Sequence, residues 1–461
     1  MNAKLLTVLA ILLIWTGCEK KELPQNVVSI VGDKPISYDE FLFSYLTMPK
    51  HPSNITEREA RLQQMDYLND RMHLFLSAEA DGLDESPEIL EKVDYIRNRE
   101  TLKYLYRKEI WEQLPVTDDE AWAEYKRENI EVKVRHLFAE SREQAQQFYD
   151  RLQNGESFES LAGEAFQDSV LAANGGDLGW LTVTSLDPLL VDSVYNARLG
   201  MPTQPLQSSF GWHVMKVEDI KQNVFLSRDY FEKNKETYVN SLRSRRATRQ
   251  SQAYVKQALT GKTVTIKGEV LTKLLQVNQT HLRMQRRESP LPAPSVDDLQ
   301  LLKIARDSDE FLNETLVEFT GGSWTVLEFL DQIRRMPPMQ RPEKLYDRGA
   351  LSSHIIDMAR DNYLLDIARE KGYDQAKPVE QEVERWRRSV LASEFLRRIQ
   401  LVAYKEENPE KWAERRALYE RIKAENPAVV DTTNLFQDVK PVDLEKRVQA
   451  IPMVLRSNYS W

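Results

Sequence analysis

The sequence predicts an α+β protein that is mainly helical, with one compact glycine-rich segment between its helices. Only 16 of the 461 residues are glycine, which favours helices over a β-barrel or a propeller. Seven of these glycines lie between residues 131 and 221. Elsewhere apolar residues recur at steps of three or four, as in helices with one buried face. The length suggests about three domains of roughly 150 residues each.

Charge and cysteine content exclude several classes of protein. The chain has 63 basic and 72 acidic residues, a formal charge of −9, and no long basic block. This balance argues against a general nucleic-acid binder. A single Cys rules out a disulfide scaffold and a cysteine-based zinc site. We therefore expect neither nucleic acid nor a metal ion as a partner.

The first residues have the pattern of an export signal. An apolar stretch of 11 residues, Leu5 to Trp15, precedes two small residues and Cys18. It is too short to span a bilayer, which needs about 20 residues. The end resembles a bacterial lipoprotein signal, although Trp15 stands where that pattern has an aliphatic residue. We expect a signal peptide over 1–17, a lipidated Cys18 and a polar tether over 18–26; the alternative is an ordinary signal peptide with an incidental Cys.

Residues 27–130 predict an N-terminal module made mainly of helices. A β-branched run, a Gly-Asp pair and a second short apolar run indicate a hairpin over Val27 to Ile36. Apolar residues at steps of three or four predict helices over 62–76 and 89–110. This pattern indicates helical packing without chemistry of its own.

Residues 131–221 predict a separate α+β domain. Val132 to Phe138 and Trp212 to Val217 alternate in character, which is typical of strands. Two helical segments and the tight loop Gly175-Gly176-Asp177-Leu178-Gly179 lie between them. Strand, helices, loop and returning strand make a compact domain of about 90 residues.

The rest of the chain predicts a second helical module. Residues 222–288 are expected to supply a helix and a strand that complete the first module. A Pro-rich stretch over 289–295 indicates a linker. Residues 296–461 are expected to form the second module, with an extended tail.

A weak internal repeat relates the two modules. Ser37 to Leu42 corresponds to Thr325 to Leu330 at an offset of 288 residues, and a Met-Pro pair follows at the same distance in both copies. The second copy continues as helix and has no glycine-rich segment. The alternative is a chance similarity between helical sequences.

Three polar residues of the 131–221 segment are candidates for chemistry. His136 and His213 each lie inside an otherwise apolar strand, and Asp168 lies between a helix and the glycine loop. Two strand-centred His can meet across neighbouring strands, and a nearby carboxylate can fix their tautomers. The alternative is a hydrogen-bonded pair in a core without a catalytic role. The chain has no HExxH, P-loop or GxGxxG motif.

The order of these elements resembles the parvulin family of peptidyl-prolyl cis/trans isomerases. The motifs that carry the resemblance are Val134-Arg135-His136-Leu137-Phe138, Asn154-Gly155-Glu156-Ser157-Phe158, Gly175-Gly176-Asp177-Leu178-Gly179-Trp180 and Phe210-Gly211-Trp212-His213-Val214-Met215-Lys216-Val217. The match covers about residues 131–221. It implies a four-stranded antiparallel sheet with flanking helices, and it implies catalytic positions at His136, Asp168 and His213.

The resemblance also implies a substrate pocket. Leu186 and Leu190 match the apolar floor below the proline ring, and Ser208 matches a small hydroxyl residue beside it. Two positions depart from the family: Leu190 lies where Met or Phe is usual, and Phe166 replaces a Ser. The reaction needs no cofactor.

The arrangement around this domain resembles the exported chaperone-foldases SurA and PrsA. It implies a parvulin domain inserted in helical chaperone modules. We expect an extracytoplasmic isomerase and chaperone, bound to a membrane through its lipid, that acts on X-Pro segments of unfolded exported polypeptides. Client binding is expected mainly in the helical modules. The alternative function is a non-catalytic holdase or assembly factor that uses the parvulin fold to bind peptides.

Overall fold

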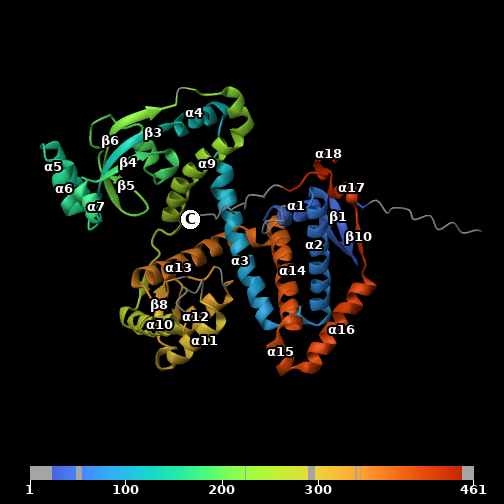
Figure 1. Cartoon of the computed structure of the whole chain (residues 1–461). Coiled ribbons are helices and arrows are strands. Elements are labelled where there is room, and N and C mark those ends of the chain that lie inside the picture. Colours follow the sequence, from blue (N-terminus) through green and yellow to red (C-terminus); the bar gives the residue numbers. More distant parts are fainter. Residues whose placement is uncertain are drawn as a thin grey trace, which may run out of the picture. The chain divides into compact units, whose positions relative to one another are not determined.

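The computed structural model describes residues 23–47, 54–223, 225–288, 296–337, 340–342 and 344–448 (Figure 1). The expected signal peptide with Cys18 and the linker 289–295 lie outside these residues. The chain divides into two compact units, and each is described by itself. The first comprises residues up to Val93 together with Glu384 onward, and the second comprises Asp94–Val383. No helix in the described ranges is both long enough and apolar enough to cross a membrane.

The first unit is built on a three-stranded sheet with the order β10-β1-β2. Its N-terminal elements are β1 (Val27–Val31), β2 (Lys34–Ser37), α1 (Tyr38–Thr47), α2 (Glu57–Ala80) and η1 (Leu83–Glu85). Its C-terminal elements are α15 (Val402–Glu407), α16 (Pro409–Glu425), β10 (Ala428–Val430), α17 (Thr432–Leu435) and α18 (Pro441–Leu444). Phe41, Phe75 and Phe395 are buried at the centre of its core.

Two long helices each belong to both units. Helix α3 (Pro87–Glu109) begins in the first unit and continues into the second, where Leu102 and Leu105 pack against Leu364 and Leu365. Helix α14 (Lys377–Gln400) begins in the second unit and continues into the first, where it contributes Phe395 to the core. The larger part of α3 therefore belongs to the second unit, and the larger part of α14 belongs to the first.

The second unit contains another three-stranded sheet, with the order β7-β8-β9. Strand β7 (Val264–Ile266) pairs with β8 (Thr315–Phe319), which pairs with β9 (Gly322–Thr325). The expectation that residues 222–288 complete the first module is therefore wrong for this strand. Strand β8 lies closer to β7 along the chain than the strands of the first unit do. Pairing β7 with β8 therefore closes a shorter loop, which costs less chain entropy.

The helices around this sheet are α10 (Gly268–Glu288), α11 (Asp298–Asp307), α12 (Val326–Arg335) and α13 (Arg348–Glu370), with the short turns η4 (Asp309–Phe311) and η6 (Tyr373–Gln375). Phe329 and Leu316 lie fully buried in their core. In the first unit, the place of β7 is taken by β10, which pairs with β1. The expectation that residues 296–461 form the second module is wrong for residues 384–448, which belong to the first unit. The expected extended tail is extended only at β10 in its described part, and residues 449–461 lie outside the description.

The two modules repeat one order of elements. The series β1, β2, α1, α2, η1, α3 matches β8, β9, α12, α13, η6, α14. Gly82 and Gly372 hold equivalent places after α2 and α13, with φ angles of 72° and 71°. This left-handed conformation ends both helices and is the one that glycine adopts without strain. The structure thus supports a duplication; the offset is 288 residues at α1 and 290 residues at the end of α2.

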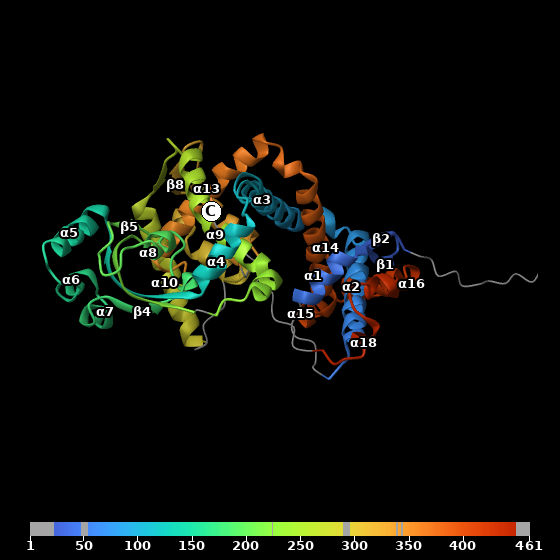
Figure 2. The same ribbon diagram turned by 90° about the horizontal axis from the view of Figure 1, so that it is seen from above.

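The glycine-rich segment forms a four-stranded antiparallel sheet in the order β4-β3-β6-β5. Its elements are β3 (Ile130–Ala139), α5 (Arg142–Gln153), α6 (Phe158–Ala165), α7 (Ser169–Ala173), β4 (Asp177–Leu181), η3 (Val183–Ser185), α8 (Val191–Tyr195), β5 (Leu206–Gln207) and β6 (Trp212–Gln222). Helices α5 and α6 cover one face, where Leu137 and Val214 are buried (Figures 1 and 2). The segment η3–α8 covers the other face, where Val134 and Met215 are buried. The predicted α+β class and the parvulin-like sheet are confirmed.

The domain is inserted through two adjacent strand ends. Ile130 pairs with Gln222, and the amide of Asn223 donates to the carbonyl of Asn129 over 3.0 Å. The flanking helices α4 (Asp118–Glu128) and α9 (Arg228–Ala258) lie side by side (Figure 2). Chain entry and exit are therefore hydrogen-bonded neighbours.

Candidate active site

His136 and His213 meet on the face of the sheet that η3–α8 covers. They lie on the paired strands β3 and β6, where Phe138 is opposite His213 and His136 is opposite Met215. Their Nδ1 atoms are 3.4 Å apart, and the rings stack with centroids 5.6 Å apart. The prediction that the two strand-centred His come together is confirmed by this geometry; their catalytic role stays a prediction.

Ser208 extends the pair into a chain of hydrogen-bonding groups. Its Oγ lies 2.7 Å from Nε2 of His213, and it accepts from the amide of Phe210 over 3.0 Å. When the hydroxyl donates to His213, the proton of His213 resides on Nδ1 and points to Nδ1 of His136. Nε2 of His136 then carries a proton, and this buried atom has no hydrogen-bond partner in the described part of the chain.

Burial keeps both imidazoles neutral. Burial and, to a smaller extent, the neighbouring His213 lower the pKa of His136 to about 4. Burial also lowers the pKa of His213, and the carboxylate of Asp187 acts in the opposite direction. A neutral imidazole can donate through one nitrogen and accept through the other. At neutral pH the pair is therefore a desolvated polar network rather than a cationic site.

Asp168 does not join the histidine pair. Its side chain caps α7, because Oδ1 accepts from the amides of Val170 and Leu171 over 2.8 and 3.0 Å. Asp168 is exposed, and within the described residues it forms no hydrogen bond or ion pair with either His. The expected His–Asp network is therefore wrong in this conformation, since the free amides of the helix start engage the carboxylate.

Asp187 is the carboxylate that acts on His213, and the sequence patterns did not predict this role. It accepts from the amide of Leu189 over 2.9 Å and from the amide of Ser209 over 3.0 Å. These bonds tie the loop after η3 to the Ser208 turn. The Asp187-Pro188 pair is a turn signal that could have drawn attention to this position.

Leu186 and Leu190 lie on the face of the sheet that η3–α8 covers. They are 8% and 4% exposed and pack with Val134 and Met215 in the core. Their contact with a proline ring stays a prediction, because in this conformation both side chains mainly fill the core.

Phe166 and Phe138 frame the pair. The Phe166 ring lies 4.9 Å from the His136 ring, and the Phe138 ring meets His213 edge-on at 5.5 Å. Phe166 therefore replaces the family's usual hydroxyl with an apolar wall, which adds to the desolvation of His136.

Glycine allows β4 to approach the histidine strand. The amide of His136 donates to the carbonyl of Gly176 over 2.9 Å. A Cβ on Gly176 would lie 2.0 Å from the carbonyl oxygen of His136, and φ is 73°. Any larger residue at position 176 would push β4 away from the site.

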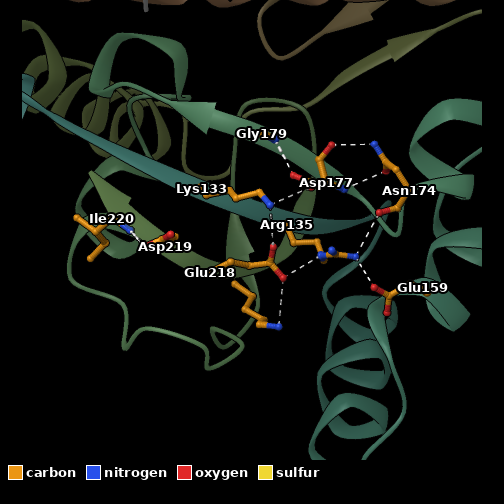
Figure 3. Close-up of polar contacts among 10 residues, drawn as sticks. Lys133, Arg135, Glu159, Asn174, Asp177, Gly179, Glu218, Asp219 and Ile220 are labelled. Carbon is orange, nitrogen blue, oxygen red and sulfur yellow. Dashed lines mark hydrogen bonds and ion pairs between the residues drawn. The ribbon is translucent and has the colours of Figure 1, made fainter. Parts of the chain in front are cut away.

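Ion pairs between charged residues connect the strands on the face of the sheet that α5 and α6 cover (Figure 3). Nε of Arg135 donates to Glu218 over 3.0 Å, and Nη1 donates to Glu159 over 2.5 Å. Lys133 lies 3.7 Å from Asp177 and thus links β3 to β4. These contacts connect β3, β4, β6 and α6, and they hold the strands that carry the two His.

Comparisons with known proteins agree with this geometry. Residues 125–221 match the family described as the PPIC-type PPIASE domain. This part of the chain is therefore a parvulin-class peptidyl-prolyl isomerase domain.

Three curated relatives show which proteins the chain is similar to. It is 27% identical over 176 residues to a foldase protein PrsA of Oceanobacillus iheyensis, covering 38% of this chain and 59% of the relative. It is 29% identical over 216 residues to a probable parvulin-type peptidyl-prolyl cis-trans isomerase of Bordetella bronchiseptica, covering 44% and 81%. It is 38% identical over 96 residues to a chaperone SurA of Pseudomonas putida, covering 19% and 22%. The chain spans about three fifths of the length of the first of these relatives, and it is similar to PrsA and SurA proteins over these parts.

Proposed function

We propose that this protein is an extracytoplasmic peptidyl-prolyl cis/trans isomerase and chaperone for unfolded exported polypeptides, held at a membrane by a lipid on Cys18. The observation that carries the proposal is the neutral pair of the half-buried His136 and the buried His213, inside the segment that matches the PPIase domain. The relatives named foldase and chaperone support the wider role. The catalytic positions proposed are His136, Asp168 and His213, with Leu186, Leu190 and Ser208 for substrate; Asp168 acts by shaping the loop that carries Phe166.

The reaction requires stabilisation of a twisted amide. Resonance keeps the X–Pro bond planar behind a barrier of about 18–20 kcal/mol, and the uncatalysed exchange takes roughly 10–100 s. The twisted amide has lost resonance and much of its charge separation. A desolvated pocket with neutral donors binds this state better than the planar one, which is catalysis by differential binding. In the tautomer in which Ser208 donates to His213, Nε2 of His136 carries the proton and is the donor proposed for this state.

An exchange assay on the full chain with several X–Pro peptides tests the isomerase. His213→Ala is expected to lower kcat/KM at least about tenfold, because it leaves both Ser208 and His136 without their partner. Leu190→Phe is expected to raise activity if the missing aromatic wall limits it.

Asp168→Asn tests the positioning role of Asp168: because Asn also caps helices, this variant should keep the loop in place and the activity within about twofold. Near-UV circular dichroism checks that each variant is folded. A folded His213→Ala variant with full activity would contradict the proposed role of the pair. A folded wild-type chain that is inactive on every peptide would favour the holdase alternative, which the burial of Leu186 and Leu190 also supports.

The chaperone role is proposed for the two modules outside the parvulin domain. Because Asn129 and Asn223 are hydrogen-bonded neighbours, a short Gly/Ser linker can replace residues 130–222 without straining α4 and α9. This variant is expected to keep suppressing the aggregation of an unfolded secreted protein, measured by light scattering. Loss of suppression in a folded variant would assign client binding to the parvulin domain instead.

Lipidation is tested by intact mass. Cys18 is expected to carry a lipid at the N-terminus of the mature, membrane-extracted protein, because several apolar chains give stable anchoring. Cys18→Ser should move the exported protein to the soluble fraction. An unmodified Cys18 in the mature wild-type protein would end this part of the proposal.

A further inference from the structure

The first unit contains a cavity of ≈ 190 Å³ between α1, α2 and the part of α14 that belongs to this unit. Its walls are rich in aromatic rings, contributed by Phe43, Tyr67, Phe75 and Trp386. A cavity of about 150 Å³ is enough to hold a benzene molecule. The space therefore accommodates one aromatic side chain.

Positive charge surrounds this aromatic cavity. Arg71, Arg385 and Arg388 line it, together with one carboxylate, Glu40. Burial raises the pKa of Glu40, although Arg388 and Arg385 act against this shift. The lining therefore holds three guanidinium groups and one carboxylate that burial drives toward its neutral form; of the three, Arg388 also pairs with Glu384 over 3.0 Å.

Arg71 differs from the other inward-facing arginines of this unit. Nη2 of Arg71 donates over 2.7 Å to the carbonyl of Ser389 and over 2.7 Å to Oγ of Ser393. Within the part of the chain that the structure describes, no carboxylate forms an ion pair with it. Arg61 and Arg415, by contrast, each pair with an Asp.

The fold itself does not require an arginine at this place. In the duplicated module, the position 290 residues further on is Asp361 in α13. A partly desolvated guanidinium without a counter-charge is costly, and a carboxylate ligand would supply the missing charge and a charge-assisted hydrogen bond. The cavity thus combines space for one aromatic ring with the Arg71 guanidinium, which has no carboxylate partner among the described residues.

We propose that this cavity binds the C-terminal residue of an unfolded polypeptide, with an aromatic side chain in the cavity and the terminal carboxylate on Arg71. This inference rests on the proposed chaperone function and names a class of client. In an extended internal segment, neighbouring side chains point to opposite faces, so a ring and the next side-chain carboxylate cannot enter one cavity together. A C-terminal aromatic residue carries both groups itself.

Peptide binding to the full chain tests the proposal. The probe is a fluorescein-labelled Gly/Ser octapeptide that ends in Phe with a free carboxylate. We expect it to bind at least about tenfold more tightly than the same peptide with a C-terminal amide or with a terminal Ala. A fourth peptide, with internal Phe-Asp and an amidated end, distinguishes a side-chain carboxylate from the terminal one.

Arg71→Met should remove the preference for the free carboxylate. The matched control is Arg58→Met on the same helix, where Arg58 is 46% exposed and lies 3.5 Å from Glu445; it should keep the preference. Equal binding of acid and amide by the wild-type chain overturns the proposal, as does an unchanged preference in folded Arg71→Met. If Arg71→Met does not fold, the four peptides on the wild-type chain decide.

Failure of this inference is distinguishable from failure of the proposed function. A chain that suppresses aggregation but binds acid and amide peptides equally refutes only the terminal site. A chain that neither suppresses aggregation nor isomerises X–Pro peptides refutes the proposed function.

Discussion

The two modules of this chain have the same architecture but differ where the first has its cavity. Phe41 and Phe329, at equivalent positions of α1 and α12, are both fully buried. Three lining positions of the first module, by contrast, carry Asp in the second. The pairs are Phe43 and Asp331, Tyr67 and Asp357, and Arg71 and Asp361.

Comparing the two modules shows which positions the fold constrains and which positions can vary. The rings at the centre of each module fill space that both copies must fill, since interiors are close-packed. The cavity positions accept aromatic, cationic or acidic side chains without changing the order of elements. Residues that differ between copies of one architecture are therefore the better candidates for function.

Removing the shared core ring should produce the largest effect. Phe41→Ala and Phe329→Ala are each expected to cost about 3–5 kcal/mol, because each ring is fully buried. Hydrogen exchange read by mass spectrometry should show the loss of protection in α2 for the first variant and in α13 for the second. Leu327→Ala, at a position 46% exposed, is the control and should change little. A small effect in either core would mean that the two are not equivalent.

A buried charge of the first module, at a position that is apolar in the second, should have the next largest effect. Arg61 is 3% exposed and pairs with Glu57 at 2.7 Å and with Asp438 at 2.9 Å, whereas the equivalent residue of the second module is the buried Leu351. Arg61→Leu is expected to cost about 3 kcal/mol, because it leaves two carboxylates without their partner. Urea unfolding of the full chain, followed by exchange in α2, measures this.

The double variant Arg61→Leu with Asp438→Leu should recover part of the loss. If Arg61→Leu is as stable as the wild type, apolar packing can replace the ion pair. The first module then accepts the same residue at this position as the second module has.

The smallest expected difference between the modules is in how their stability depends on acidic pH. The second module has a half-buried His354 where the first has Gln64; burial lowers the pKa of His354 from its ordinary value of 6.5, and Asp357 opposes this. The unfolded chain then binds the proton more readily than the folded one. Stability is therefore full above pH 6.5 and falls as the pH drops through 6.5 toward the folded pKa.

The variant His354→Gln should flatten this part of the stability curve of α13, measured by hydrogen exchange at pH 7.5 and 5.5. The Nε2 atom of His354 is buried and has no hydrogen-bond partner among the described residues, so the folded state offers no acceptor for a proton on this atom. An unchanged slope in the variant would assign the acid sensitivity to other groups.

Local patterns in the sequence predict much of this structure. Periodicity predicts α2 and α3, and alternation predicts β3 and β6, because both patterns report which side chains face a core. The meeting of His136 and His213 follows from their places in neighbouring strands. The resemblance to parvulins supplies the sheet of four strands, which the residues alone do not.

Long-range partners are what the sequence does not predict. The register of β10 on β1 joins Val430 to Ser29, and no local pattern in a three-residue strand specifies that partner. Asp168 is found at a helix start because local amides compete for its carboxylate, whereas Asp187 reaches His213 through a loop. The cavity beside Arg71 depends on α14, which comes from the other copy of the repeat.

The two helices shared between the units have a consequence for the order in which the chain folds. The core of the first unit needs Phe395 beside Phe41, and these residues are separated by the whole second unit. Closing a flexible loop of that length costs roughly 5 kcal/mol of chain entropy. Once the second unit is folded, Nη1 of Arg97 at the start of its α3 segment donates to the carbonyl of Asp374, just before α14, over 3.3 Å. The long loop is then a short one, so the second unit serves as a clamp whose formation makes assembly of the first unit fast.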